Sequence, residues 1–320
     1  MNQPLVLPLA RAAIDRDYLT RTRDEVFGEL FANTHARVMP IYDSRVLLLG
    51  PAEHPQPKLQ LVDPAQVPNW QHLVYLGKTT DESDDLPIGS PIILAILDED
   101  QASKLAPLDR WQHLRRTGAG LSDRDSGLFT QGLALANWHA NHKFCPRCGA
   151  TTIVKQAGWV RECSVDGHEL FPRTDPAIIV SVIDDQDRIL LGSQGVWEAN
   201  RWSILAGFVE PGESLTAAVL REMHEEAGVH VIDPEYLGSQ AWPFPYSLMV
   251  GFTAKLDPQH SEKDLLPDGF EIEKLRWFSR DDIAAEASQL LLPGRMTISR
   301  ALIEHWYGSE IVSATELEKP

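Results

Sequence analysis

Cysteine is the scarcest feature of this sequence, with three residues among 320. These three, Cys145, Cys148 and Cys163, lie within nineteen residues of one another. A clustered set of this size does not form a disulfide framework for a chain of this length. Such clustering is more typical of a metal site in a reducing compartment.

Long apolar runs are also missing. No stretch of 18 or more apolar residues occurs, which excludes a hydrophobic membrane-spanning helix. The start of the chain, Met1 to Arg16, lacks the basic and apolar regions of a signal peptide. We find no internal repeat at a fixed period and no low-complexity segment. The sequence therefore predicts a cytoplasmic protein with no membrane partner.

Basic residues are the minority charge, 29 against 46 acidic residues, which gives a formal net charge of −17. This balance works against generic binding to nucleic acid or to anionic membranes. An anionic substrate would need a local reversal of the field, which bound divalent cations can supply. With 43% hydrophobic residues the chain can build sizeable cores, and its length suggests two domains plus a small insert.

Apolar runs separated by polar breaks predict strands at 45–49, 72–76 and 91–97, within an N-terminal α/β domain over 1–125. A helix is expected over 126–142, with Ser126 as its N-cap. This helix leads into the cysteines, so residues 126–172 read as a linker helix and a zinc-ribbon-like motif.

The second large domain is expected over 173–308. Residues 177–183 and 188–191 predict two strands joined by a turn at 184–187. The polar segment 309–320 lacks periodicity and predicts a flexible tail.

The most informative segment runs from Gly207 to Val229, GFVEPGESLTAAVLREMHEEAGV. Ser214 fits an N-cap, an apolar stripe follows at helical spacing, and Gly228 fits the position after the helix. Three carboxylates, Glu222, Glu225 and Glu226, would share one face, where like charges cost roughly 0.2–0.5 kcal/mol per pair. A divalent cation would compensate. The alternative is an acidic solvated helix face.

Arg221 precedes these carboxylates and is expected to orient them. It can pair with Glu225 four residues on, or reach back to Glu213 in the preceding loop.

Together these residues resemble the Nudix box. The resemblance implies a mixed α/β/α sandwich in which the box forms a loop, a helix and a loop, and it implies hydrolysis of a nucleoside diphosphate linked to another moiety. It further implies that Glu222 and Glu226 are ligands for Mg²⁺ or Mn²⁺. Glu225 would be a ligand or water-activating group, and the carbonyl of Ala206 a further ligand. Whether Glu225 or Glu226 is the base stays open.

A second segment, SQAWPFPYS at 239–247, follows ten residues after the box. Prolines on both sides of Phe244 restrict the backbone, so Trp242 and Phe244 can present flat faces to a base or a nicotinamide ring. Gln240 and Ser247 add polar contacts. The alternative is a rigid surface loop whose aromatic rings pack into the core.

This segment resembles the SQPWPFPxS array of the NADH pyrophosphatase branch of the Nudix family, and the resemblance covers most of residues 126–307. The sequence departs at Ala241, where the family has proline. The resemblance implies further substrate contacts and one further metal ligand, Glu271, whose rival is Glu273 on the same face of an expected strand. The implied substrate-binding residues are Phe171, Phe208, Gln240, Ala241, Trp242, Pro243, Phe244, Pro245, Tyr246, Ser247 and Ser299. An ordinary core position remains the alternative for Phe171 and Phe208.

The cysteines resemble an incomplete zinc ribbon. Cys145 and Cys148 form a knuckle and Cys163 follows, but Asp166 stands at the place of the family's fourth cysteine. Asp166 can still bind zinc, or His168 can replace it. Alternatively the metal has been lost and packing holds the ribbon, with Trp159 and Phe171 as candidate core residues. Zinc here would be structural.

The resemblance to this branch of the Nudix family implies an enzyme that splits NAD(H) into nicotinamide mononucleotide and AMP. Two or three Mg²⁺ or Mn²⁺ ions would activate water, held by Glu222, Glu226 and Glu271. The alternatives are another nucleoside diphosphate such as ADP-ribose or diadenosine diphosphate, removal of a 5′ NAD cap from RNA, and a non-enzymatic ribbon that binds RNA. For capped RNA, the candidate guides are Lys143, Arg147, Lys155, Arg161 and Arg173. The family resemblance also implies a homodimer with composite active sites.

Overall fold

The computed structural model describes residues 5–314 except 24, 51–53, 55, 68 and 83–85. The contacts divide the chain into two units. The N-terminal unit comprises residues 9–174 together with 242–246, and the C-terminal unit comprises residues up to 8, 175–241 and 247 onward. In the described part of the chain, no helix is long and apolar enough to cross a membrane.

The N-terminal unit is built on a seven-stranded mixed sheet in the order β1-β5-β6-β2-β3-β4, with β7 also paired to β3. The strands predicted at 45–49, 72–76 and 91–97 are confirmed as β3, β5 and β6. The sheet strands are β1 (Ile14–Asp15), β2 (Arg37–Tyr42), β3 (Arg45–Leu49), β4 (Lys58–Leu59), β5 (His72–Thr79), β6 (Pro91–Ile96) and β7 (Trp111–His113). The short helices of this unit are α1 (Tyr18–Arg21), α2 (Val26–Ala32), α3 (Glu99–Leu105) and α4 (Leu114–Thr117).

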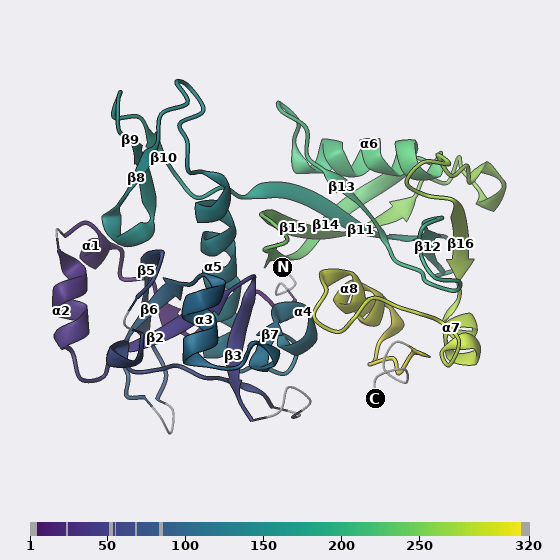
Figure 1. The fold of residues 1–320 in the computed structure, drawn as a ribbon. Helices are drawn as coiled ribbons and strands as arrows, with labels where there is room; N and C mark the ends of the chain where they lie inside the picture. The colour runs from purple at the N-terminus through teal and green to yellow at the C-terminus, as the bar shows by residue number, and fades with distance from the viewer. Residues whose placement is uncertain are drawn as a thin grey trace. The chain divides into compact units, whose positions relative to one another are not determined.

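The long helix α5 (Asp123–Asn141) packs on this sheet (Figure 1). It begins earlier than predicted: the N-cap is Ser122, whose hydroxyl accepts a hydrogen bond from the backbone N–H of Asp125, and Ser126 lies inside the helix. Asp123 and Asp125 occupy the first turn, where acidic side chains are favoured by the helix dipole. Asp125 also accepts a hydrogen bond from the backbone N–H of Leu59, which fixes this turn against the rest of the unit.

A three-stranded antiparallel sheet follows α5 in the order β10-β9-β8. Its strands are β8 (Thr152–Lys155), β9 (Val160–Cys163) and β10 (Glu169–Leu170). The cysteines lie around this small sheet.

The C-terminal unit holds a six-stranded sheet in the order β14-β15-β11-β12-β16, with β13 paired to β11. The strands predicted at 177–183 and 188–191 correspond to β11 and β12. The strands are β11 (Asp175–Ile183), β12 (Ile189–Ser193), β13 (Leu205–Phe208), β14 (Val231–Trp242), β15 (Ser247–Leu256) and β16 (Lys274–Phe278). The helices are α6 (Leu215–Ala227), α7 (Arg280–Glu286) and α8 (Ile298–Tyr307).

Alternation along β11 separates two cores. Ile178, Val180 and Val182 belong to the core that includes the apolar stripe of α6, while Ile179 belongs to the core that includes α8. Successive side chains of a strand point to opposite faces, so one strand serves both layers. The α6 and α8 helices therefore cover opposite faces of the sheet (Figure 1), and the predicted α/β/α sandwich is confirmed.

Residues 309–314 belong to the segment predicted as a flexible tail, yet Ile311 and Ala314 are buried. The fully buried guanidinium of Arg300 donates to the carbonyl of Ile311 and ties this segment to α8. Residues 315–320 of the predicted tail lie outside the described residues.

Candidate active site

The α6 helix places two carboxylates in the interior and one at the surface. Ser214 caps its start by accepting from the backbone N–H of Ala217, and Gly228 ends it with φ at 70°. Both ends agree with the prediction. Glu222 and Glu226, four residues apart, are buried, whereas Glu225 is exposed. The three glutamates therefore share the helix but not the same environment.

Arg221 organises this acidic set. Its guanidinium donates to both carboxylate oxygens of Glu213 at 2.9 Å, to Glu222 at 2.8 Å and to Glu225 at 2.9 Å. A fifth hydrogen bond, 2.9 Å long, goes to the carbonyl of Phe208 in β13. Both pairings predicted for Arg221 thus occur at once. The hydrogen bonds that Arg221 donates to Glu213 are the main cause of its raised pKa, so the guanidinium stays charged.

Gly207 allows the Glu222 carboxylate to lie directly against β13. A β-carbon built on Gly207 would fall 2.0 Å from the carboxylate carbon of Glu222. Any larger residue at this position would have to displace the glutamate. Gly207 is therefore needed for the close approach of the Glu222 carboxylate to β13.

Glu226 places a buried carboxyl group among other acidic side chains with incomplete compensation. One of its oxygens, Oε2, is buried and has no hydrogen-bond partner. Burial and, after it, the charges of Glu222, Glu271 and Asp268 together raise the Glu226 pKa to about 8, although a hydrogen bond from the backbone of Ala206 opposes them. A bound cation would supply the missing partner, because burying an unpaired carboxylate is costly. The donors are all hard oxygen atoms, which suits Mg²⁺ or Mn²⁺.

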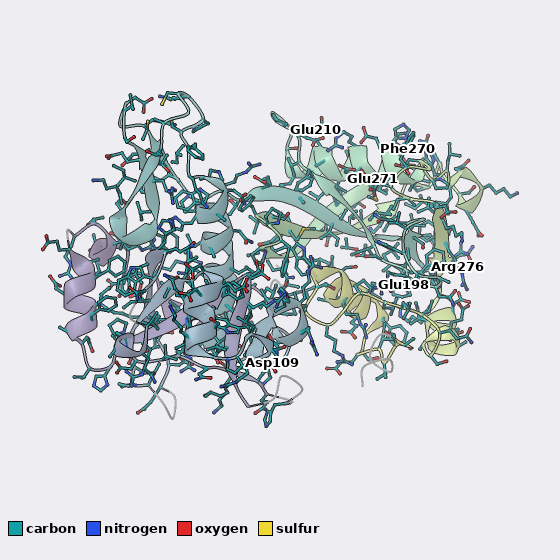
Figure 2. The ribbon with its side chains drawn as sticks, in the orientation of Figure 1. Asp109, Glu198, Glu210, Phe270, Glu271 and Arg276 are labelled. Carbon is teal, nitrogen blue, oxygen red and sulfur yellow. The ribbon has the colours of Figure 1, made fainter. Side chains whose placement is uncertain are left out.

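Glu271 belongs to this carboxylate set, and Glu273 does not. The charge of Glu271 acts on both Glu222 and Glu226, and Figure 2 places Glu271 beside α6. The carboxylate of Glu273 instead lies against Gly195. Neither residue is in a strand, contrary to the expectation, because β16 begins only at Lys274.

A turn built by Asp268 sets the position of Glu271. The Asp268 carboxylate accepts hydrogen bonds from the backbone N–H groups of Phe270, Glu271 and Ile272. These three donors hold the pKa of Asp268 below its usual range despite the opposing effect of burial. Its charge faces the same acidic region as Glu226.

The segment Trp242 to Tyr246 packs within the N-terminal unit. The Asn137 side chain donates to the carbonyl of Pro243 at 2.9 Å, and the Tyr246 hydroxyl donates to the Asn137 carbonyl at 3.1 Å. Trp242 and Phe244 meet edge to face with ring centroids 4.9 Å apart. The expected stiff loop therefore has a second support, the C-terminal half of α5.

Arg115, which the sequence reasoning did not single out, stacks on this aromatic pair. Its guanidinium carbon lies 4.2 Å from the centroid of Phe244 and 5.2 Å from that of Trp242. Arg115 is exposed and comes from α4, more than 120 residues earlier in the chain. Only the tertiary structure brings this positive charge to the rings.

The remaining predicted contacts differ in exposure. Phe171 and Phe208 are each 60% exposed, so neither is the core phenylalanine of the alternative interpretation. Gln240 is buried and donates to the carbonyl of Met296. The Ser299 hydroxyl is also buried and lies 2.8 Å from the Ser203 hydroxyl.

Three predicted contacts remain. Ala241 and Ser247 are half-buried residues of β14 and β15, and Pro245 follows the aromatic pair directly.

The ribbon brings its three thiols and one carboxylate to a single point. Ligand atoms of Cys145, Cys148, Cys163 and Asp166 all lie within 4.8 Å of one another. His168 is not part of this cluster, and its backbone N–H instead donates to Asp166. Four convergent donors match the coordination number of structural zinc.

Two predictions about the ribbon need correction. Phe171 cannot serve as its core, because the ring is exposed. Arg161 cannot guide a nucleic-acid strand directly, because its side chain is buried.

Within the described residues, the cysteine cluster is the one group of three or more metal-capable side chains that converge this closely. The glutamates around α6 are more widely spaced. Mg²⁺ tolerates such spacing because it retains several waters when bound.

Comparisons with known proteins agree with both parts of this description. The NUDIX domain family matches residues 172–297, and the NADH pyrophosphatase zinc ribbon domain matches residues 140–171. The NAD-capped RNA hydrolase NudC of Mycobacterium tuberculosis is 46% identical over 207 residues, which are 62% of this chain and 65% of that protein. The human NAD-capped RNA hydrolase NUDT12 is 36% identical over 200 residues, 58% of this chain and 42% of that protein.

Among solved structures, a NUDIX hydrolase from Nitrosomonas europaea is similar to this chain, with a TM-score of 0.41 and 22% sequence identity. The match covers 53% of this chain and 95% of that chain. For both NAD-capped RNA hydrolases, the match to this chain spans less than two thirds of the relative's own length. From the two domain matches, the chain contains a Nudix domain at residues 172–297, preceded by an NADH pyrophosphatase zinc ribbon domain at residues 140–171.

Proposed function

We propose that this chain hydrolyses the diphosphate bond of NAD(H) to give nicotinamide mononucleotide and AMP. The observation that carries the proposal is the buried Oε2 atom of Glu226, which has no hydrogen-bond partner. It lies in a set of carboxylates that Arg221 holds together through hydrogen bonds. An acidic site of this kind repels a diphosphate unless cations intervene. Substrate binding and metal binding are therefore linked at this site.

Glu222, Glu226 and Glu271 would hold Mg²⁺ or Mn²⁺, with the Ala206 carbonyl as a further ligand. When bound, such ions supply neutralisation of the diphosphate charge and a lower pKa for the attacking water. Arg221 keeps Glu222 and Glu225 in place through its hydrogen bonds. Glu225 and Glu226 remain the two candidates for the base that accepts the water proton.

The aromatic segment would select the substrate. Trp242 and Phe244 offer flat faces to the nicotinamide or adenine ring, and exposed Phe171 and Phe208 offer two more. Arg115 adds a fixed positive charge beside Phe244, suited to a phosphate of the dinucleotide. A product assay on NAD(H), ADP-ribose and diadenosine diphosphate separates the substrate alternatives, and any turnover contradicts a purely RNA-binding ribbon.

Removal of a 5′ NAD cap from RNA is the second candidate. It requires cleavage of the same bond, and the relatives described above are named for this activity. Four exposed basic residues remain as candidate guides for the strand: Lys143, Arg147, Lys155 and Arg173. The homodimer with composite active sites and the cytoplasmic location also stay predictions.

Replacing Glu226 with Gln should reduce NADH hydrolysis by more than about 100-fold, because the amide keeps the shape but cannot bind the cation. Because the Glu226 pKa is raised to about 8, this residue makes the metal-free fold progressively less stable as the pH rises from the ordinary carboxyl pKa to about 8. The variant without metal should therefore melt no lower than the unmodified protein at pH 8. Near-normal turnover in saturating Mg²⁺ would contradict the assignment.

Glu271→Gln should weaken metal activation, with partial recovery in excess Mg²⁺, because one of several hard ligands is lost. Glu273→Gln is the matched control, since Glu273 lies against Gly195 instead. The measurement is the Mg²⁺ dependence of turnover for both variants. A larger loss in Glu273→Gln would show that the wrong glutamate has been chosen.

Trp242→Ala and Phe244→Ala should each lower turnover of NADH more than turnover of a diphosphate that lacks an aromatic ring to stack. Base-stacking contacts contribute about 1–3 kcal/mol, so a loss of roughly tenfold or more is expected for NADH alone. Parallel kinetics on both substrates test this. Equal losses would mean that the rings only support the fold.

For the ribbon, we expect about one zinc per chain after purification, removable by a mild chelator, because a carboxylate replaces one soft thiolate. Asp166→Cys should tighten zinc binding, since Asp166 already lies among the cysteines. His168→Ala is the control and should leave the zinc content unchanged. Metal analysis and melting with and without chelator provide the readout, and a zinc-free protein with an unchanged melt would refute the site.

A further inference from the structure

The N-terminal unit contains a buried guanidinium with no acidic partner. Arg161, in β9, is 4% exposed and forms no ion pair within the described part of the chain. Its donors go to neutral acceptors: the Thr152 hydroxyl at 2.7 Å, the Thr152 carbonyl at 3.3 Å and Nδ1 of His139 at 2.9 Å. The hydrogen bonds are satisfied, but the positive charge is not compensated.

His139 connects this charge to a cavity. Because Nδ1 accepts from Arg161, the ring proton lies on Nε2, which donates to the Gly158 carbonyl at 2.9 Å. Burial is the main reason that the His139 pKa falls to about 3, so this imidazole is neutral. It therefore neither compensates the positive charge of Arg161 nor adds to it. Its ring stacks on His72 with centroids 5.2 Å apart.

The cavity has a volume of about 310 Å³ and is lined by side chains from β5, β6 and α5. His72, His139, Gln71 and Lys143 form its polar wall, and apolar residues such as Ile96 form the rest. Neither the His72 ring nor the Lys143 ammonium has a hydrogen bond or ion pair within the described residues. Both groups are therefore available to a ligand.

The surroundings of the cavity are positive, although the chain as a whole carries −17. Burial lowers the His72 pKa, and the charges of Arg161 and Lys143 lower it further. No carboxylate is among the main influences on His72, His139 or Arg161. The positive charges of Arg161 and Lys143 near His72 are suited to hold an anion there.

We propose that this cavity binds the phosphate group of a small phosphorylated ligand, with Lys143 and His72 as its contacts and Arg161 as the buried charge behind them. Lys143 and Gln71 supply donors at the mouth. The volume exceeds that of one phosphate ion and leaves room for an attached sugar. The proposal concerns the N-terminal unit and does not depend on the reaction proposed for the Nudix domain.

Binding can be measured by calorimetry with inorganic phosphate, ribose 5-phosphate and, as the neutral control, ribose. The full zinc-loaded chain is used in buffer without added divalent cations, because the acidic Nudix site then repels anions. Phosphate and ribose 5-phosphate should bind with one site per chain, and ribose should not bind. Absence of phosphate binding at millimolar concentrations would overturn the proposal.

The variants locate the site. Lys143→Gln should weaken phosphate binding at least about tenfold, because a charge-assisted hydrogen bond is lost. Lys155→Gln is the matched control, an exposed lysine on β8 of the same ribbon that does not line the cavity. His72→Gln tests the second contact, and zinc content and melting temperature verify that each variant is folded. Equal weakening by Lys143→Gln and Lys155→Gln would indicate general attraction to basic residues and refute the site.

Discussion

The guanidinium of Arg221 holds the acidic site together. It connects the loop before α6 through Glu213, the helix itself through Glu222 and Glu225, and β13 through the Phe208 carbonyl. One planar group with five donors can serve all these acceptors, which a lysine cannot do. One positive charge does not balance the surrounding carboxylates, and this surplus of negative charge is the basis for proposing a cation at the site.

Local patterns in the sequence predicted the α6 helix accurately because all of its determinants are near neighbours. Ser214, the apolar stripe and Gly228 act within one segment, and no distant contact overrides them. The predicted start of α5 was wrong because a distant contact is involved there. Ser122 and Ser126 are both suitable caps, and the choice depends partly on Asp125 bonding to Leu59, which is far away in the sequence.

Parts of the candidate site could not be found by periodicity. The turn that presents Glu271 depends on three amides bonding to one carboxylate, and no alternation of polar and apolar residues reveals it. The partners of the aromatic segment, Asn137 and Arg115, lie more than a hundred residues earlier in the chain. The sequence resemblance identified the segment, but only the fold shows that it packs within the N-terminal unit.

Arg161, which is buried, and Arg221, which is half-buried, have contrasting surroundings. Arg221 bonds to three carboxylates beside three further acidic groups, so negative charge is in excess and a cation would complete the region. Arg161 bonds only to neutral oxygen and nitrogen atoms, so positive charge is in excess and an anion would complete it. Hydrogen-bond satisfaction is similar in the two cases, and it is the charge balance that indicates what each region binds.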